Sequence, residues 1–259
     1  MTGVQTCALP ILGAIIGGLY SQRLDSFEVE QRIKEFLQSP LFQKARETHP
    51  TQPGAGSWIE HLSLQLMHQV QHPEQTRDQI ARTDVEMQEA LKILLQDQDI
   101  RNSQVPFVAV ASDLLTGAEV VLTQGSMLQA VLASSAMPGV LSPVKVNGHL
   151  LSDGAATSAV PIRAARRIAS KSPVVAVDVS SQLSGTPVLN HPLDVILRNS
   201  AITGRCYHQE LIKEADVLVQ PHVKVFSWSD FDHVEDFIAE GEQAALKQIR
   251  AIKNLARMI

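Results

Sequence analysis

Asp153 is the residue of this 259-residue chain whose type and neighbours best fit a catalytic role. A carboxylate within hydrogen-bond reach of a serine hydroxyl can accept its proton and turn a poor nucleophile into an effective one. Gly154 and Ala155 follow Asp153 and are small, so the loop can bring the carboxylate close to another backbone segment. An isolated Asp-Gly pair usually indicates only a turn. The residues before Asp153 must therefore decide between a turn and a general base.

The preceding segment is unusually specific. It contains Ala133-Ser134-Ser135-Ala136-Met137-Pro138-Gly139, then Ser142-Pro143, then Leu150-Leu151-Ser152-Asp153-Gly154-Ala155. This arrangement resembles the patatin-like phospholipases, which carry an A-S-x-A-x-P-G run, a short hairpin and a catalytic Asp in D-G-[GA]. The resemblance extends from about Leu12 to the C-terminal helix and is strongest between Phe107 and Pro161. It implies a Ser–Asp dyad without histidine, in which Asp153 is the proton acceptor.

The family's nucleophile is a serine in a G-x-S-x-G turn immediately before a helix. Residues 13–20, with three glycines, read much like that helix, and Leu12 and Gly13 fit the last two positions of the turn. The nucleophile position is then occupied by Ile11, and no G-x-S-x-G occurs elsewhere in the chain. The family's glycine-rich oxyanion loop, G-G-G-x-[RK]-G, is also missing. Residues 54–56 cannot substitute for it, because they contain too few glycines and lie too far along the chain.

Residues 2–11 resemble the conceptual translation of a sequencing-adapter oligonucleotide. We therefore expect residues 1–11 to be a non-native segment, and residues 12–259 to be a truncated patatin-like domain that includes the C-terminal helix. The alternative is a genuine start followed by an ordinary apolar helix. The genomic sequence upstream of the Leu12 codon would distinguish the two.

Composition excludes several classes of protein. With 44% hydrophobic and 19% charged residues, the chain can bury a sizeable core. The 22 basic and 27 acidic residues give a net charge of −5, which provides no electrostatic footprint for nucleic acid. No internal repeat and no linker long enough to divide two domains is evident. We expect one large α/β domain.

Cysteine usage and hydropathy favour a cytoplasmic location. Cys7 lies in the suspected non-native segment, which leaves Cys206 alone and rules out a disulfide framework. The longest apolar run, residues 8–19, is shorter than the roughly 20 residues that span a bilayer. No Lys or Arg precedes Arg23, so a secretory signal is not indicated.

Apolar spacing predicts helices first, and strands alternating with helices after residue 104. The predicted helices are residues 13–24, 27–37, 41–48, 58–71, 74–95, 127–135, 161–170, 193–213 and 232–257. The predicted strands are residues 105–111, 119–122, a hairpin over 144–151 around Asn147-Gly148, a buried parallel strand over 173–179, and 216–220. This alternation predicts an α/β fold. The fold class is a layered patatin-like fold with a mostly parallel central sheet flanked by helices, lacking its first strand or strands.

Other candidate residues favour structural roles. His61, His68 and His72 share one helical face, but no Asp, Glu or Cys motif completes a metal site, so a solvated polar face is preferred. Asp113 matches a recurring family segment and is expected to form a turn rather than to act in catalysis.

Four residues, Trp58, Leu62, Leu66 and Met67, either line an acyl-chain pocket or pack as ordinary amphipathic helices.

The resemblance implies a patatin-like acyl hydrolase that cleaves phospholipid or related lipid esters through a covalent acyl-enzyme. No metal and no organic cofactor are implied. The partners are an acyl-lipid or phospholipid substrate and, transiently, a membrane surface, with the oligomeric state undefined. As printed, the chain lacks the serine and the oxyanion loop, so we expect it to be inactive. The alternative is a non-catalytic lipid-binding or interaction protein on the same fold.

Overall fold

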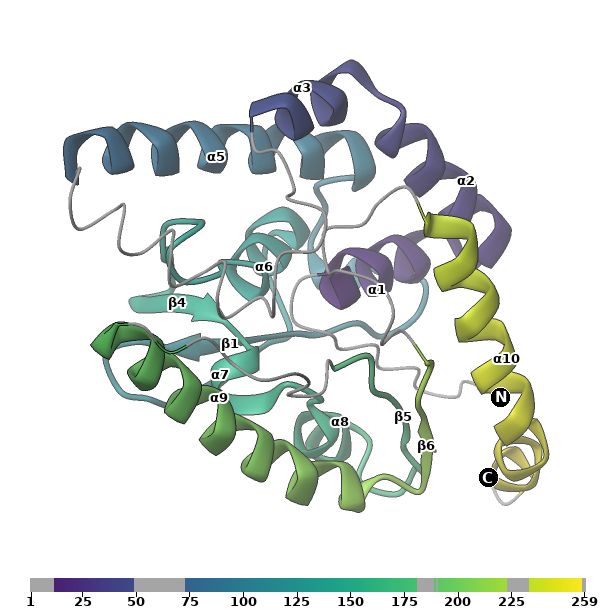
Figure 1. The fold of residues 1–259 in the computed structure, drawn as a ribbon. Helices are drawn as coiled ribbons and strands as arrows, with labels where there is room; N and C mark the ends of the chain where they lie inside the picture. Colours follow the sequence, from purple (N-terminus) through teal and green to yellow (C-terminus); the bar gives the residue numbers. More distant parts are fainter. Residues whose placement is uncertain (1–11, 49–72, 181–188, 190, 223–232, 258–259) are drawn as a thin grey trace. The chain divides into compact units, whose positions relative to one another are not determined.

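The computed structural model describes residues 12–48, 73–180, 189, 191–222 and 233–257 of the chain (Figure 1). These residues group into two units. The first contains residues 12–48 and 74–169, and the second contains residues 73, 170–180, 189, 191–222 and 233–257.

Four helices open the first unit: α1 (Leu12–Arg23), α2 (Ser26–Leu37), α3 (Pro40–Thr48) and α5 (Pro73–Leu94). Asp25 begins α2, because its carboxylate accepts hydrogen bonds from the backbone N–H groups of Phe27 and Glu28. Arg32 on α2 donates to the carbonyls of Ile93 and Leu94, the last residues of α5, and so ties these two helices together.

Gly18 on α1 packs closely against side chains of the neighbouring elements. A Cβ placed on Gly18 would lie 3.2 Å from the Leu95 side chain and 3.5 Å from that of Val131. Val131 belongs to α6 (Met127–Ser134), which contacts α1 on one side and strands of the sheet on the other. The core around these elements includes the fully buried residues Leu19, Leu91, Met127, Val131 and Leu151.

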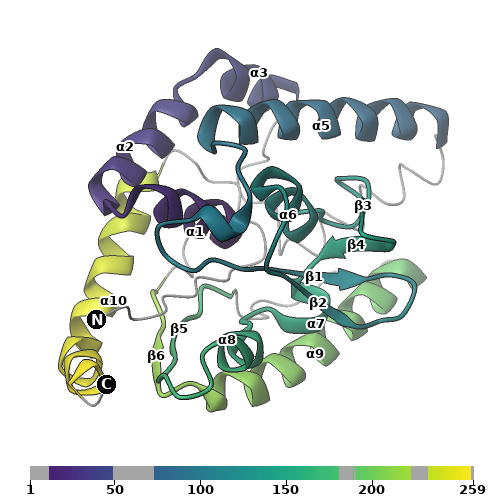
Figure 2. The same cartoon turned by 180° about the vertical axis from the view of Figure 1, so that it is seen from behind.

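A four-stranded sheet lies at the centre of the first unit, in the order β2-β1-β4-β3. Its strands are β1 (Ala109–Asp113), β2 (Glu119–Leu122), β3 (Val144–Val146) and β4 (His149–Asp153). Helix α6 covers one face, while α7 (Ala155–Ser158) and α8 (Ile162–Ile168) lie on the other (Figures 1 and 2). The layered α/β arrangement is therefore confirmed.

The predicted mostly parallel character of the sheet is wrong for these four strands, since every neighbouring pair is antiparallel. The reason is local. Tight turns join β1 to β2 and β3 to β4, and such turns can connect only antiparallel neighbours. Gly117, Asn147 and Gly148 have positive φ angles of 73°, 49° and 85° in these turns, a region that glycine and asparagine tolerate best.

Strand β1 begins at Ala109, four residues later than predicted. Pro106 has no N–H to donate to a strand ladder. The neighbouring N–H groups of Gln104 and Val105 instead donate to the carbonyl of Ser21 on α1. A short 3₁₀ helix, η1 (Ile100–Asn102), precedes this segment. Residues 104 and 105 are thus bound to α1 before the chain enters β1.

In the second unit, β5 (Val175–Val177) and β6 (Val217–Val219) pair in parallel, as predicted for residues 173–179. Helix α10 (Val234–Ala256) packs on β6, and α9 (Pro192–Leu211) continues into the 3₁₀ helix η2 (Ile212–Glu214). The predicted burial of β5 is wrong for two of its three residues, because Val175 and Val177 are 36% and 39% exposed. Strand β6 is the one neighbour that β5 has among the described strands, and α10 packs on β6.

The core position of Leu151 on β4 gives a direct test of this packing. Truncation to alanine should lower the free energy of unfolding by about 2–5 kcal/mol, because the side chain is 0% exposed and a cavity would remain. Urea unfolding followed by circular dichroism measures the change. Leu246→Ala, at a leucine 56% exposed on α10, is the control and should cost at most about 0.5 kcal/mol. Equal losses in the two variants would contradict the packing described.

Candidate active site

Asp153 is the last residue of β4, and the carbonyl of Ala136 fixes its backbone. The N–H of Asp153 donates to this carbonyl at 3.0 Å, and the Ser152 hydroxyl donates to the same oxygen at 2.8 Å. Ala136 belongs to the A-S-x-A-x-P-G run, and Asp153 begins the D-G-A motif. The two motifs that carry the family resemblance are thus joined by hydrogen bonds.

The Asp153 carboxylate is largely desolvated. The residue is 7% exposed, and the N–H of Ala155 donates to its Oδ1 at 2.8 Å. Burial raises the pKa of Asp153 to about 6, and the Ala155 hydrogen bond opposes part of that shift. A carboxylate with a pKa near 6 is a stronger base than a solvated aspartate and is still mostly ionised above pH 7. Burial at this position therefore favours proton transfer by Asp153 but lowers the free energy of unfolding.

Gly154 is required by the close approach of two backbones rather than by an unusual dihedral angle. Its φ is −64°, which any residue can adopt. A Cβ at this position would overlap the carbonyl oxygen of Val110 on β1 and lie 3.0 Å from the carbonyl carbon. The sequence predicted that small residues would allow a close approach at this point. The structure identifies β1 as the element approached.

Two buried hydroxyls reinforce the site from β1 and α6. Ser112 Oγ donates to the carbonyl of Asp153 at 2.8 Å and lies 2.9 Å from Thr157 Oγ1 on α7. Ser134 Oγ donates to the carbonyl of Val110 at 2.8 Å. Sequence reasoning did not assign roles to these residues. The available signal was the presence of polar residues within otherwise apolar, buried segments.

Asp113 forms the predicted structural turn. Its carboxylate accepts from Thr116 Oγ1 at 2.8 Å and from the N–H of Leu115 at 3.2 Å, and it lies 3.0 Å from Nδ1 of His149. The contact with His149, followed by that with Thr116, lowers the pKa of Asp113 to about 2. These bonds fix the link between β1 and β2.

Several predicted site residues lie outside the described part of the chain. These are Ile11, residues 54–56, Trp58, Leu62, Leu66, Met67 and the three histidines at 61, 68 and 72. Leu12 and Gly13 begin α1, which contacts α6, and α6 in turn contacts β4. The expected proximity of Asp153 to the nucleophile position stays a prediction.

The second unit contains a Ser, His and Asp cluster that differs from a catalytic triad. His208 Nε2 lies 3.1 Å from Asp178 Oδ2 and also 3.1 Å from Ser180 Oγ. In a triad these two partners contact different ring nitrogens, so that the aspartate orients the ring while the other nitrogen accepts the serine proton. In this cluster Nδ1 of His208 is buried without a hydrogen-bond partner among the described residues, and Asp178 favours a proton on Nε2. The His208 ring is therefore not arranged as the general base of Ser180.

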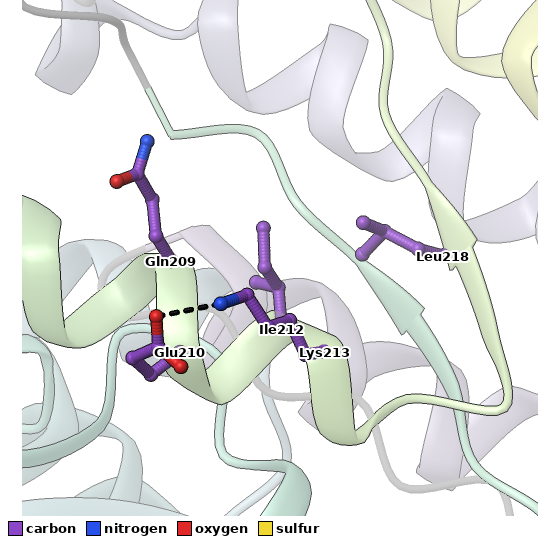
Figure 3. A pocket seen from close by; sticks show the side chains of 5 residues that line it. All are labelled: Gln209, Glu210, Ile212, Lys213 and Leu218. Carbon is purple, nitrogen blue, oxygen red and sulfur yellow. Dashed lines mark hydrogen bonds and ion pairs between the residues drawn. The ribbon is translucent and has the colours of Figure 1, made fainter.

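An open pocket of about 350 Å³ lies in the same unit, lined by Gln209, Glu210, Ile212, Lys213 and Leu218 (Figure 3). Lys213 Nζ is paired with Glu210 Oε1 at 2.6 Å, so the ammonium is neutralised by its neighbour. The five lining residues include no serine, cysteine or histidine. Acyl-transfer chemistry is not indicated in this pocket.

Within the described residues, no three His, Cys, Asp or Glu side chains gather as a metal site would require. None of the helices in the described ranges combines the length and the apolar character that crossing a bilayer demands.

The sequence profile described as patatin-like phospholipase matches residues 12–166, which is more than half of the chain and includes β1, β4 and Asp153. The chain therefore belongs to the patatin-like phospholipase family.

Curated relatives agree with this assignment. An uncharacterized NTE family protein of Mycobacterium tuberculosis is 26% identical over 152 residues, which cover 58% of this chain and 34% of that protein. Human patatin-like phospholipase domain-containing protein 6 is 26% identical over 173 residues, which cover 66% of this chain and 11% of that protein. Mouse patatin-like phospholipase domain-containing protein 7 is 33% identical over 91 residues, 34% of this chain and 7% of that protein. The chain thus spans about a third or less of these relatives.

The close approach at Gly154 predicts a large effect of one added methyl group. Gly154→Ala should lower the free energy of unfolding by at least about 2 kcal/mol, because a rigid backbone carbonyl occupies the space for Cβ. Gly241→Ala on α10 is the matched control: nothing lies within 4 Å of its Cβ, and alanine should stabilise that helix by up to about 1 kcal/mol. Denaturant unfolding of both variants measures the difference. A neutral effect at Gly154 would be incompatible with this geometry.

The raised pKa of Asp153 predicts a stability that depends on pH. The folded state holds the Asp153 proton up to about pH 6, whereas the unfolded state loses it near pH 4. The free-energy cost of burying the ionised carboxylate therefore appears as pH rises from about 4 to 6 and is complete above pH 6. Asp153→Asn should therefore stabilise the protein by about 2–3 kcal/mol at pH 7.5, with the gain vanishing near pH 4. Unfolding measured across this range tests it.

Asp113→Asn is the opposite control for that experiment. The lowered pKa of Asp113 contributes stability above about pH 4 that is lost as pH falls toward 2. This variant should be destabilised at pH 7.5 and approach the parent protein at low pH. Parallel behaviour of the two variants would contradict the assignment of opposite pKa shifts.

Proposed function

We propose that this chain carries the base of a lipid acyl hydrolase site, with Asp153 as the proton acceptor of a Ser–Asp dyad. Family membership supports lipid acyl hydrolase function in general. The observation that carries the finer assignment is the desolvated carboxylate of Asp153, whose pKa is raised to about 6 at the rigid end of β4. A protein gains nothing in stability from an ionised carboxylate buried in this way, so a chemical role is the better explanation.

In the proposed reaction, Asp153 accepts the proton of a serine hydroxyl as that oxygen attacks the ester carbonyl of an acyl lipid. Asp153 returns this proton to the alkoxide as the carbon–oxygen bond of the substrate ester breaks, so the alcohol leaves and an acyl-enzyme ester remains on the serine. Asp153 then accepts a proton from the water that attacks the acyl-enzyme, and passes it to the serine oxygen as the fatty acid is released. The hydrogen bond from the N–H of Asp153 to the Ala136 carbonyl, and that from the Ser112 hydroxyl to the Asp153 carbonyl, would keep the carboxylate in place through both steps.

A second candidate function follows from the printed sequence itself. Position 11, the nucleophile position that the resemblance implies, is isoleucine, and no G-x-S-x-G occurs in the chain. An alkyl side chain has neither a proton to lose nor a lone pair with which to attack. The chain as printed would then bind lipid or a partner without hydrolysing it.

A paired assay separates the two functions. The printed chain should show no turnover of p-nitrophenyl acyl esters above background. A version in which a family-type segment with G-x-S-x-G is joined at Leu12 should hydrolyse them, and its rate should fall below about pH 6 as Asp153 is protonated. In that version Asp153→Asn should reduce kcat by several orders of magnitude, because the amide cannot accept the serine proton.

The outcomes are distinct. Saturable turnover by the printed chain would disprove the prediction that isoleucine at position 11 prevents hydrolysis. Near-parental turnover of Asp153→Asn in the joined version would remove Asp153 from the mechanism. An inactive joined version with a native circular dichroism spectrum would favour the non-catalytic function.

A further inference from the structure

The link between β1 and β2 exposes two adjacent leucines. Residues 114–118, referred to as the hairpin tip, read Leu-Leu-Thr-Gly-Ala. Leu114 is 53% exposed, and Leu115 is 70% exposed, more than any other large hydrophobic residue among those that the structure describes. Single exposed leucines are common on protein surfaces. A neighbouring pair at the end of a hairpin is a more specific feature.

Hydrogen bonds of the turn hold these leucines in exposed positions. Asp113, 2% exposed, accepts from the N–H of Leu115 and from the Thr116 hydroxyl, while its own N–H donates to the carbonyl of Ala118 at 2.9 Å. The N–H of Leu114 donates to the carbonyl of Leu150 on β4 at 2.8 Å. The backbone is thus held from both sides. The leucine side chains project from a fixed scaffold.

The charge distribution suits contact with an apolar medium. The hairpin tip has no ionisable side chain, and the adjacent carboxylate of Asp113 is turned inward toward His149. At the base of the hairpin, Glu119 is ion-paired with Arg167 of α8. The end of the hairpin can therefore enter a low-dielectric layer without bringing an unpaired acidic group with it.

We propose that the hairpin tip is a lipid-surface anchor, in which Leu114 and Leu115 insert among the acyl chains of a bilayer. The inference rests on the proposed function, since a hydrolase of phospholipids must reach a substrate that resides in an aggregate. It names the residues that make the contact. The insertion is hydrophobic, because a chain of net charge −5 gains no general attraction to anionic lipid. Binding should therefore persist at high salt.

Vesicle binding tests the anchor without requiring hydrolysis, so it is independent of whether the chain is an active enzyme. The full chain is sedimented with sucrose-loaded phosphatidylcholine vesicles in 0.1 M and 1 M NaCl. We expect Leu114→Ser and Leu115→Ser each to weaken partitioning at least about tenfold, and the double variant to abolish it. Leu246→Ser, at a leucine on α10 that is 56% exposed, should bind like the parent.

A second variant preserves the hydrophobic character of the tip. Leu115→Trp should bind vesicles, and the added indole fluorescence should be quenched by lipids brominated on their acyl chains. The inference is overturned if the parent does not bind, if Leu246→Ser weakens binding as much as the tip variants do, or if the new tryptophan is not quenched. It is also overturned if binding disappears in 1 M NaCl. Loss of self-association in the tip variants without lipid would assign the surface to a second copy of the chain instead.

Discussion

The candidate site depends on one backbone oxygen, the carbonyl of Ala136. It accepts hydrogen bonds from the N–H of Asp153 and from the hydroxyl of Ser152. These two residues are consecutive on β4, so their side chains point to opposite faces of the sheet. Ala136 follows α6, whose other contacts reach α1 and the core. The position of the carboxylate is therefore set by the helix layer as well as by the sheet. A shift of α6 would be transmitted directly to Asp153.

The buried serines explain how a polar site fits into an apolar core. Ser112, Ser134 and Ser152 each donate to a backbone carbonyl at 2.8 Å. A buried hydroxyl without such a bond would be costly, but a satisfied one adds directional contacts between segments. The absence of a side chain on Gly154, directly after β4, also lets the backbones approach closely, as its contact with Val110 shows. Small polar residues thus provide both proximity and orientation.

The sequence allowed the local features to be predicted but not those that depend on distant partners. The hairpin at Asn147-Gly148 was predictable, because its positive φ angles require such residues. The parallel sheet was wrongly predicted, because alternating strands and helices suggest crossovers, whereas tight turns connect β1 to β2 and β3 to β4. Asp153 was identified through motif resemblance. Its raised pKa was not predictable, because it arises from burial by residues that are remote in sequence.

The topology of the sheet also orders the steps by which the site forms during folding. Two hairpins, β1–β2 and β3–β4, close over short loops, and local closures of this kind have a low entropic cost. The pairing of β1 with β4 joins Ala111 to Asp153 across a much longer loop that contains α6. We expect this pairing to form after the hairpins. The carboxylate would then be removed from water only in the final stage of assembly, and partly folded chains would hold Asp153 as an ordinary solvated aspartate.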